Sequence, residues 1–170
     1  MTKFKGSILS NDLQVVEERE AWNTLDSFLK KRARGYSGGI SSPNSAFIHG
    51  SRLSPHLAWG TISLRAIFTE LEKRINQAKE DRGERGWTRS LRAFQSRLFW
   101  RDHFIQRLES FPQLEEKPLN RAYGNLEYQD CDQKLGAWLN GKTGFPMVDA
   151  CMRCLAETGF LNFRMRAMLV

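Results

Sequence analysis

Residues 88–110 read TRSLRAFQSRLFWRDHFIQRLES, and the apolar side chains of this stretch recur every three or four positions. That spacing is the period of an α-helix that buries one face. The residues of this face are Leu91, Phe94, Leu98, Ile105 and Leu108. No segment of the chain shows the alternation of apolar and polar residues that is typical of a strand. We therefore predict an all-α fold, in which this segment forms the longest helix.

The segments on either side also have helical spacing and helix-end signals. We expect six further helices, at residues 13–34, 55–59, 64–78, 132–140, 146–158 and 163–170. Proline in a first turn and glycine after a helix end favour several of these boundaries. The candidate N-cap residues are Asp12, Ser54, Ser63 and Asn162. A loop is expected at residues 35–43, where glycine, serine and proline dominate.

Two of these helices have apolar faces that we expect to be buried. In the first helix the face consists of Trp22, Leu25, Phe28 and Leu29. In the helix at 146–158 it consists of Met147, Val148, Cys151, Met152 and Leu155. The cations at residues 30–34 would lie in the last turns of the first helix, where they offset the helix dipole. Asp149 and Arg153 are four residues apart, which predicts an ordinary ion pair.

Length and composition limit the class of protein. The chain has 170 residues, of which 41% are hydrophobic and 26% are charged. This size favours one domain with a real core, and the composition excludes wholesale disorder. No run of about 18 apolar residues predicts a membrane span, and the first residues lack the apolar core of a secretory signal. Because three cysteines cannot pair completely, we expect a reducing, cytoplasmic location.

The positive charge is concentrated in the middle of the chain. The formal net charge is +7, and residues 30–101 carry 15 basic and 5 acidic residues. A basic middle segment indicates a polyanionic partner, such as nucleic acid or a phosphate-bearing cofactor. The alternative is a solvated basic face without a partner.

Two motifs could provide this chemistry. The segment Ser51-Arg52-Leu53-Ser54-Pro55 places two hydroxyls and an arginine at the start of a predicted helix, where backbone N–H groups favour an anion. The alternative is that these residues only cap the helix. Arg97 and Arg101 share one face of the long helix, close to Phe94 and Trp100. Such a face suits phosphate contacts and base stacking, although a solvated basic face would have the same pattern.

Cys151 and Cys154 form a single Cys-x-x-Cys within a predicted helix. A zinc site needs a second pair or histidines at ligand spacing, which His49, His56 and His103 do not provide. We therefore expect the two cysteines to pack in the core and predict no metal site. No Ser/His/Asp set, P-loop or pair of carboxylates singles out a catalytic residue.

Three segments together resemble the photolyase/cryptochrome family. They are residues 50–63 (GSRLSPHLAWGTIS), 99–102 (FWRD) and 141–153 (GKTGFPMVDACMR), the last followed by residues 158–160 and 162–166. Their order and spacing are similar to the family over nearly the whole chain. The resemblance implies the front part of the family's C-terminal FAD-binding domain, a helical fold that binds a U-shaped FAD.

The resemblance also implies which residues hold the cofactor. They are Tyr36, Gly50, Ser51, Arg52, Leu53, Ser54, Phe94, Arg101 and Arg166. Residues 50–54 would hold the FAD phosphates, with Tyr36 near them. Phe94 and Arg101 would approach the flavin, and Arg166 would lie beside its isoalloxazine ring.

Damaged DNA is the partner that the resemblance implies, because reduced FAD in this family repairs pyrimidine dimers by light-driven electron transfer. Arg97, Trp100 and Arg164 would face the DNA. Tyr128 stands where the family has the outermost tryptophan of an electron-transfer chain. Arg97 replaces a glutamate that reads the dimer, and Phe163 replaces an asparagine near the lesion. We therefore expect repair to be impaired in this chain.

Two alternatives remain: a cryptochrome-like flavoprotein without repair activity, and a flavin-free helical module that binds nucleic acid. We expect residues 1–170 to form one C-terminally incomplete domain, without the family's antenna domain and ending before its second flavin segment, so that FAD binds weakly. The last predicted helix ends on an apolar face of Phe163, Met165, Met168 and Leu169. Self-association through this face is expected, and no membrane partner is.

Overall fold

The computed structural model describes residues 13–80, 85–127 and 131–169, and all regular structure in these ranges is helical. This confirms the predicted all-α class. The α-helices are α1 Glu18–Lys30, α2 Tyr36–Gly39, α3 Pro43–His49, α4 Ser54–Trp59, α5 Leu64–Glu80, α6 Arg85–Ser110, α7 Asp132–Leu139, α8 Pro146–Thr158 and α9 Phe163–Leu169. Short 3₁₀ helices are η1 Arg32–Gly35, η3 Pro112–Glu115 and η4 Arg121–Tyr123.

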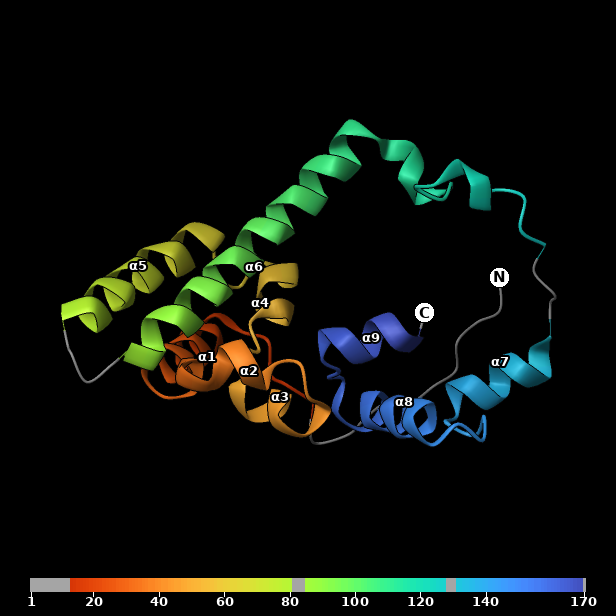
Figure 1. Cartoon of the computed structure of the whole chain (residues 1–170), viewed down its shortest axis with the longest axis horizontal. Coiled ribbons are helices and arrows are strands. Elements are labelled where there is room, and N and C mark those ends of the chain that lie inside the picture. The colour runs from red at the N-terminus through yellow and green to blue at the C-terminus, as the bar shows by residue number, and fades with distance from the viewer. Residues whose placement is uncertain (1–12, 81–84, 128–130, 170) are drawn as a thin grey trace.

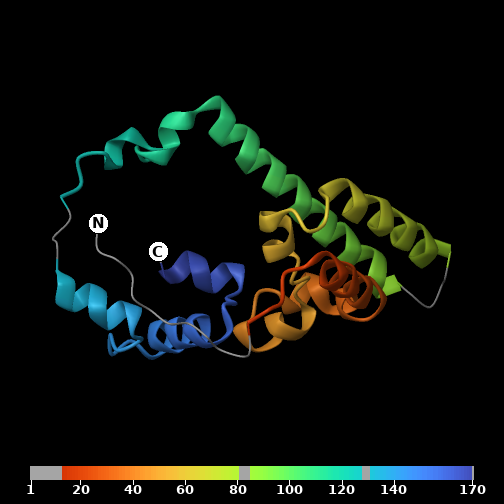
Figure 2. The same cartoon turned by 180° about the vertical axis from the view of Figure 1, so that it is seen from behind.

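The helices form an open ring in which the long α6 makes up one side (Figures 1 and 2). α5 packs along the first half of α6, and η1 and α2 pack against another side of it. The second half of α6 leads away from this bundle. The chain then returns through α7, α8 and α9, which bring it back beside α3. Segments from the two ends of the chain therefore meet.

The core lies where α1, α2, α5 and α6 converge, and three aromatic rings form its centre. The Phe28 ring makes edge contacts with Phe94 at 4.7 Å and with Tyr36 at 5.6 Å between ring centroids. Tyr36 and Phe94 are in turn 5.5 Å apart. Other buried members are Leu25, Leu29, Leu53, Ile62, Ile67, Leu71, Ile75, Trp87, Leu91 and Leu98. Edge-to-face packing of this kind stabilises aromatic pairs beyond simple burial.

The first helix is shorter than expected. It spans Glu18–Lys30 rather than residues 13–34, so its N-cap is Glu17 and not the expected Asp12, and Arg32 lies in η1 and not in a last helical turn. Trp22, predicted to be buried, is 42% exposed, and Ala21 is buried in its place. The reason is the helical rotation of about 100° per residue: Ala21 lies on the same face as Leu25 and Phe28, whereas Trp22 lies outside it.

Residues 35–43, predicted to be a loop, instead contain α2 and the start of α3. Tertiary contacts hold this turn in helical form. The Tyr36 ring is buried against α1 and α6, and the Ser90 hydroxyl accepts from the Ser37 N–H at 3.2 Å. The same hydroxyl donates to the Arg34 carbonyl at 2.8 Å. Glycine and serine propensities are overridden here by packing against α6.

Two predicted apolar faces are only partly covered. On α6, Leu91, Phe94 and Leu98 are buried, but Ile105 and Leu108 are exposed because this half of the helix extends beyond α5. On α8, Cys151 and Met152 are buried as predicted. Met147 and Leu155 are exposed, because the described neighbours α7 and α9 cover only one side of α8.

Several of the other helix ends follow the predicted signals. The Ser63 hydroxyl caps α5 by accepting from the Ala66 N–H at 3.1 Å, and Gly60 and Gly159 end α4 and α8 with left-handed φ values of 71° and 64°. Ser54 does not cap: it is the first residue of α4, which follows Leu53. The Asn162 side chain bonds to the α2–α3 turn and does not cap α9. Asp12 lies outside the described residues.

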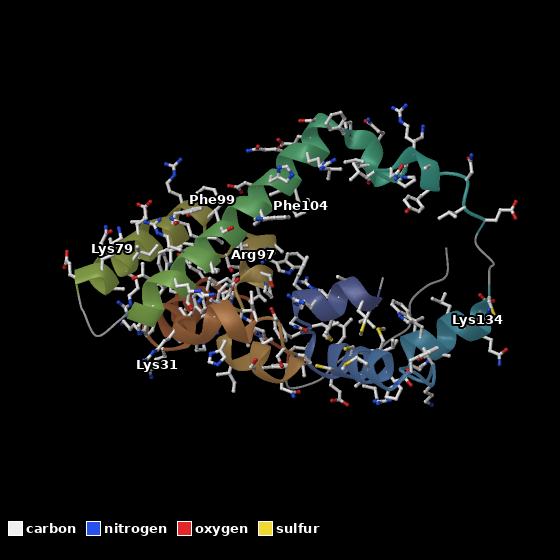
Figure 3. The ribbon with its side chains drawn as sticks, in the orientation of Figure 1. Lys31, Lys79, Arg97, Phe99, Phe104 and Lys134 are labelled. Atoms are coloured by element: carbon white, nitrogen blue, oxygen red, sulfur yellow. The ribbon has the colours of Figure 1, made fainter. Side chains whose placement is uncertain are left out.

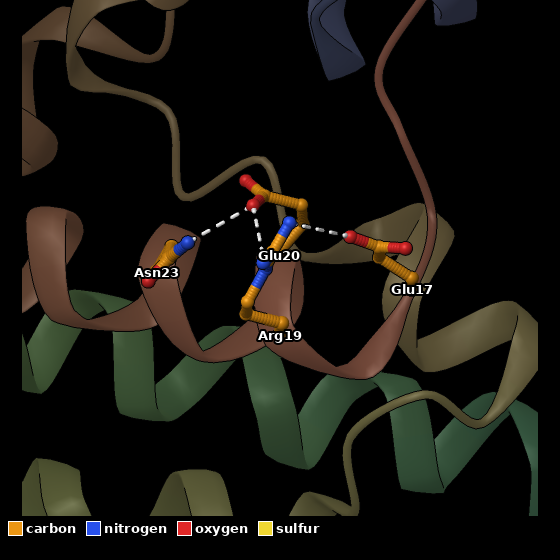
Figure 4. Close-up of polar contacts among 4 residues, drawn as sticks. All are labelled: Glu17, Arg19, Glu20 and Asn23. Carbon is orange, nitrogen blue, oxygen red and sulfur yellow. Dashed lines mark hydrogen bonds and ion pairs between the residues drawn. The ribbon is translucent and has the colours of Figure 1, made fainter.

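The start of α1 carries a small polar network on its surface (Figure 4). Arg19 lies 3.5 Å from Glu17 and 3.8 Å from Glu20, and Asn23 donates to Glu20 at 3.0 Å. Such exposed pairs contribute little to stability. None of the described helices is long and apolar enough to cross a membrane.

Candidate functional site

The segment between α3 and α4 is held in an unusual backbone conformation. Arg52 has a φ of +61°, in the left-handed region that side chains other than glycine rarely adopt. The Gln14 amide donates to the Arg52 carbonyl at 2.9 Å and contacts the His56 Nε2 at 3.0 Å. His56 is fully buried, and its Nδ1 lies 3.0 Å from the Thr61 hydroxyl. Burial lowers the pKa of His56, against a smaller opposing effect of Glu20, and this favours the neutral ring.

Arg32 fastens this segment to α1. Its guanidinium donates to the carbonyls of Gly50 and Ser51, the latter at 3.2 Å. It also donates to the Thr24 carbonyl at 2.9 Å and the Ser27 hydroxyl at 3.1 Å. The acceptors are backbone carbonyls and a hydroxyl, which are uncharged, so none of them neutralises the positive charge of Arg32.

Two cations, Arg52 in this segment and Arg32 packed against it, therefore have no anionic partner among the described residues. Burial and the nearby Arg52 charge lower the pKa of Arg32, and burial also lowers the pKa of Arg52. In the described part of the chain, no carboxylate lies within ion-pairing distance of either guanidinium. Because half-buried cations are normally paired, this arrangement favours an anionic ligand. The Ser51 and Ser54 hydroxyls lie in the same segment.

Tyr36 and Phe94, expected near the cofactor, form part of the aromatic core. Burial raises the pKa of Tyr36 to about 12, against a smaller lowering by the Arg97 charge. The phenol therefore stays neutral at physiological pH. Arg101 lies next to α4, where its Nη2 donates to the Leu57 carbonyl at 3.5 Å, and its Nη1 is 3.7 Å from Asp102. The contacts of Tyr36, Phe94 and Arg101 with the cofactor remain predictions.

Aromatic and cationic side chains line one exposed side of α6. The Arg97 guanidinium lies 5.7 Å from the Trp100 ring centroid, and the Trp100 and Phe104 rings are 5.9 Å apart. Trp100 is 51% exposed and Phe104 is 55% exposed. Figure 3 shows Arg97 and Phe104 toward the middle of the ring of helices, whereas Phe99 lies on the other side, where it contacts Phe68 of α5. We call Arg97, Trp100 and Phe104 the α6 stripe.

The turn before α9 meets the α3 region. The Phe160 ring lies 4.7 Å from the Phe47 ring and 4.2 Å from the Arg52 guanidinium. The Asn162 amide donates to the carbonyls of Ile40 and Ser41 at 3.1 and 3.4 Å, so this side chain joins α9 to the α2–α3 turn instead of capping α9. Arg164 and Arg166 are both exposed on α9. Tyr128 lies outside the described residues.

The predicted ion pair in the segment 141–153 is wrong. The Asp149 carboxylate accepts from the Thr143 N–H at 2.7 Å, from the Thr143 hydroxyl at 2.6 Å and from the Gly144 N–H at 3.0 Å. Arg153 donates instead to the Gly141 carbonyl at 2.8 Å. The hydrogen bond from the Thr143 hydroxyl is the largest cause of the lowered pKa of Asp149. Asp149 therefore closes the turn that begins α8.

Asp149→Asn is expected to loosen this turn. The amide keeps the shape but loses the charge and one acceptor oxygen, so backbone amides at 141–149 should exchange roughly tenfold faster at pH 7. In the unchanged chain the pKa of Asp149 is lower in the folded state than in the unfolded state. The stabilisation of the turn by this carboxylate is therefore fully present above about pH 4 and is lost as the pH falls through the folded-state pKa. Hydrogen exchange followed by mass spectrometry tests both effects. Asp132→Asn, an equal charge change on α7, should leave these amides unaffected.

Comparison with known proteins identifies the family. Residues 94–170 match the model of the FAD binding domain of DNA photolyase. A deoxyribodipyrimidine photo-lyase of Thermus thermophilus is 39% identical over 117 residues, which cover 69% of this chain and 25% of that protein. This chain is homologous to part of the photolyase/cryptochrome FAD-binding domain. The family resemblance indicates FAD as its cofactor.

Two solved structures of the photolyase/cryptochrome family have the same fold. A class III photolyase from Agrobacterium tumefaciens superposes with a TM-score of 0.77 at 31% identity, and a Synechocystis cryptochrome with a TM-score of 0.77 at 28% identity. Each superposition covers 90% of this chain and 30% of the solved chain. The chain thus spans less than a third of the length of these relatives.

Several residues of this photolyase-like site were not found from the sequence. Arg32 was interpreted as a helix-end cation, and Gln14, Phe47 and Phe160 were not singled out for any role. One arginine within the basic run at residues 30–34 gives no local sign that its donors reach Gly50.

Proposed function

We propose that this chain forms part of a photolyase-like flavoprotein, in which Gly50–Ser54 bind the FAD phosphates and α6 contacts DNA. The observation that carries the proposal is the pair of half-buried guanidiniums, Arg32 and Arg52, which have no carboxylate partner among the described residues. Arg52 lies within the segment that resembles the family's phosphate-binding segment, and Arg32 donates to the carbonyls of Gly50 and Ser51. A diphosphate would supply the missing negative charge, so the residues present fit the phosphate half of FAD.

Each residue of the segment would have a distinct part in binding. The Ser51 and Ser54 hydroxyls would donate to phosphate oxygens, and the charges of Arg32 and Arg52 would offset the charge of the diphosphate. Arg101 and Arg166 would orient the flavin. When bound, reduced FAD supplies the light-excited electron that splits a pyrimidine dimer. The protein supplies orientation and charge.

Titration with FAD tests the cofactor proposal. Tyr36 and Phe94 are packed in the core, so the described residues offer mainly the phosphate side of a site. We therefore expect weak saturable binding, with a Kd between about 1 µM and 1 mM. Isothermal titration and quenching of flavin fluorescence measure it. No saturation at millimolar FAD would contradict cofactor binding, and a sub-micromolar Kd would contradict the expected weakness. Arg32→Ala should weaken FAD binding, whereas Arg65→Ala, which removes the same charge from the exposed side of α5, should leave it unchanged.

The exposed α6 stripe supports the nucleic-acid part of the proposal. An arginine next to two exposed rings can contact a phosphate while the rings stack on bases. Arg164 on α9 would add a second phosphate contact. Because a cation occupies position 97, we propose contacts to the DNA backbone and not recognition of the dimer. A FAD-free chain that still bound DNA would favour the helical nucleic-acid-binding module over the flavoprotein.

Self-association is expected through the exposed side of α9. Phe163 is 68% exposed and Met168 is also exposed, so α9 presents an apolar surface. Sedimentation velocity over a concentration series should show dimers or larger species. Phe163→Ser should shift the protein toward monomer, whereas Thr69→Ser on α5 should not. A monomer at all concentrations would contradict this prediction.

A further inference from the structure

The Arg52 side chain lies beside two aromatic rings, Phe47 and Phe160, that touch each other although they are far apart in the sequence. Its guanidinium is 4.2 Å from the centroid of the Phe160 ring and 5.4 Å from that of Phe47. The two rings are also in edge contact with each other at 4.7 Å. A planar guanidinium over aromatic faces is a favourable cation–π arrangement, and an ammonium group does not reproduce its stacking.

Both sides of this contact are held in place. On one side, the Gln14 amide donates to the Arg52 carbonyl, and Arg52 Nε donates to Gln14 Oε1 at 3.4 Å. On the other side, the Phe160 carbonyl accepts from the Cys154 thiol at 3.5 Å and the Thr158 hydroxyl at 3.3 Å. The Phe160 N–H donates to the same hydroxyl at 3.2 Å. A shift of the Arg52 guanidinium or of the Phe160 ring would therefore also move the backbone of that residue.

The contact is important because it joins two regions whose helices pack mainly within each region. Helices α7, α8 and α9 pack chiefly on one another, while α1 to α6 form the bundle. The Asn162 amide, bonded to the α2–α3 turn, is the second tie. The position of α9, which carries Arg164 and Arg166, thus depends on Arg52, Phe160 and Asn162.

We propose that Arg52 is a positioning residue that clamps Phe160 against Phe47, so that binding of a diphosphate at Ser51–Ser54 and ordering of α9 are coupled. This inference rests on the proposed function, because it takes the diphosphate of FAD as the ligand. A ligand that restrains Arg52 also restrains Phe160. By reciprocity, a loosened Phe160 weakens ligand binding by the same factor. Cation–π strengths correspond to a coupling of roughly 3- to 30-fold.

Hydrogen exchange without ligand tests the clamp itself. The full chain is compared with Arg52→Lys, which keeps the charge, and with Phe160→Leu, which keeps an apolar side chain. Both should raise exchange at residues 160–169 by about 3- to 30-fold and leave α5 and α6 unchanged. The matched control is Phe145→Leu, since Phe145 lies in the same region and is 70% exposed. The double variant should show no effect beyond that of Phe160→Leu alone, because Phe160→Leu already removes the contact with Arg52. Wild-type exchange of α9 in both single variants would overturn the clamp.

Inorganic pyrophosphate as the probe tests the coupling. Saturating pyrophosphate should slow exchange at 160–169 in the unchanged chain, and Phe160→Leu should weaken its binding by about 3- to 30-fold although Phe160 offers no side-chain donor. Unchanged pyrophosphate affinity in Phe160→Leu would overturn the coupling. Failure of the unchanged chain to bind either pyrophosphate or FAD would overturn the proposed function, while the ligand-free exchange would still decide whether Arg52 is a clamp.

Discussion

Phe28→Ala is expected to lower the free energy of unfolding by about 3–5 kcal/mol. The Phe28 side chain is fully buried, and its ring contacts both Tyr36 and Phe94. Truncation would remove these contacts and leave a cavity between α1, α2 and α6. Domains of this size are stable by only about 5–15 kcal/mol, so this change would remove a large part of the stability.

Urea denaturation followed by circular dichroism measures this loss. Trp22→Ala on the same helix is the control, since it removes a larger ring that is 42% exposed. It should cost no more than about 1 kcal/mol. An equal loss in the two variants would mean that the three-ring cluster is not the centre of the core.

Arg97→Ala is expected to weaken binding to damaged and undamaged DNA alike. Arg97 lies on the exposed α6 stripe, in the segment of the chain with the largest positive charge. A lost phosphate contact releases one counterion fewer, so the slope of log K against log salt should fall by roughly 0.7–0.9. Fluorescence anisotropy over a series of salt concentrations measures it. Arg65→Ala removes the same charge from α5 and should change the slope much less.

Arg97→Glu separates phosphate contact from lesion reading. A carboxylate at this position would repel the backbone, so general binding should fall below that of Arg97→Ala. If Arg97→Glu instead left general binding intact and raised affinity for dimer-containing DNA selectively, position 97 would read the lesion. The assignment of Arg97 to the DNA backbone would then be wrong.

The helices themselves were largely predictable, because their signals are local. Apolar spacing placed α5, α6, α7 and α8 within a few residues of their observed bounds. Gly60 and Gly159 mark helix ends because the left-handed φ at each position suits glycine. The sequence also located the positive charge in residues 30–101. It did not show which of these cations lie close together in the fold.

Burial was predicted less well, because it depends on what packs opposite a helix. The spacing of Ile105 and Leu108 is that of a buried face, yet both are exposed where α6 extends past α5. Residues 35–39 look like a loop by composition, yet the Tyr36 ring anchors them as helix in the core. Asp149 and Arg153 have ion-pair spacing, yet the Thr143 and Gly144 donors compete successfully for the carboxylate.

By itself, the sequence determined the all-α class, most helix boundaries and the segment Ser51–Ser54 as a candidate anion site. Each of these depends on neighbours within about one or two helical turns, where side-chain spacing and backbone preference act directly. Only the tertiary structure decided that Arg32 reaches Gly50 and that Arg52 stacks on Phe160. Those contacts join segments far apart in the chain, and their geometry follows from the path of the whole backbone, which no local preference encodes.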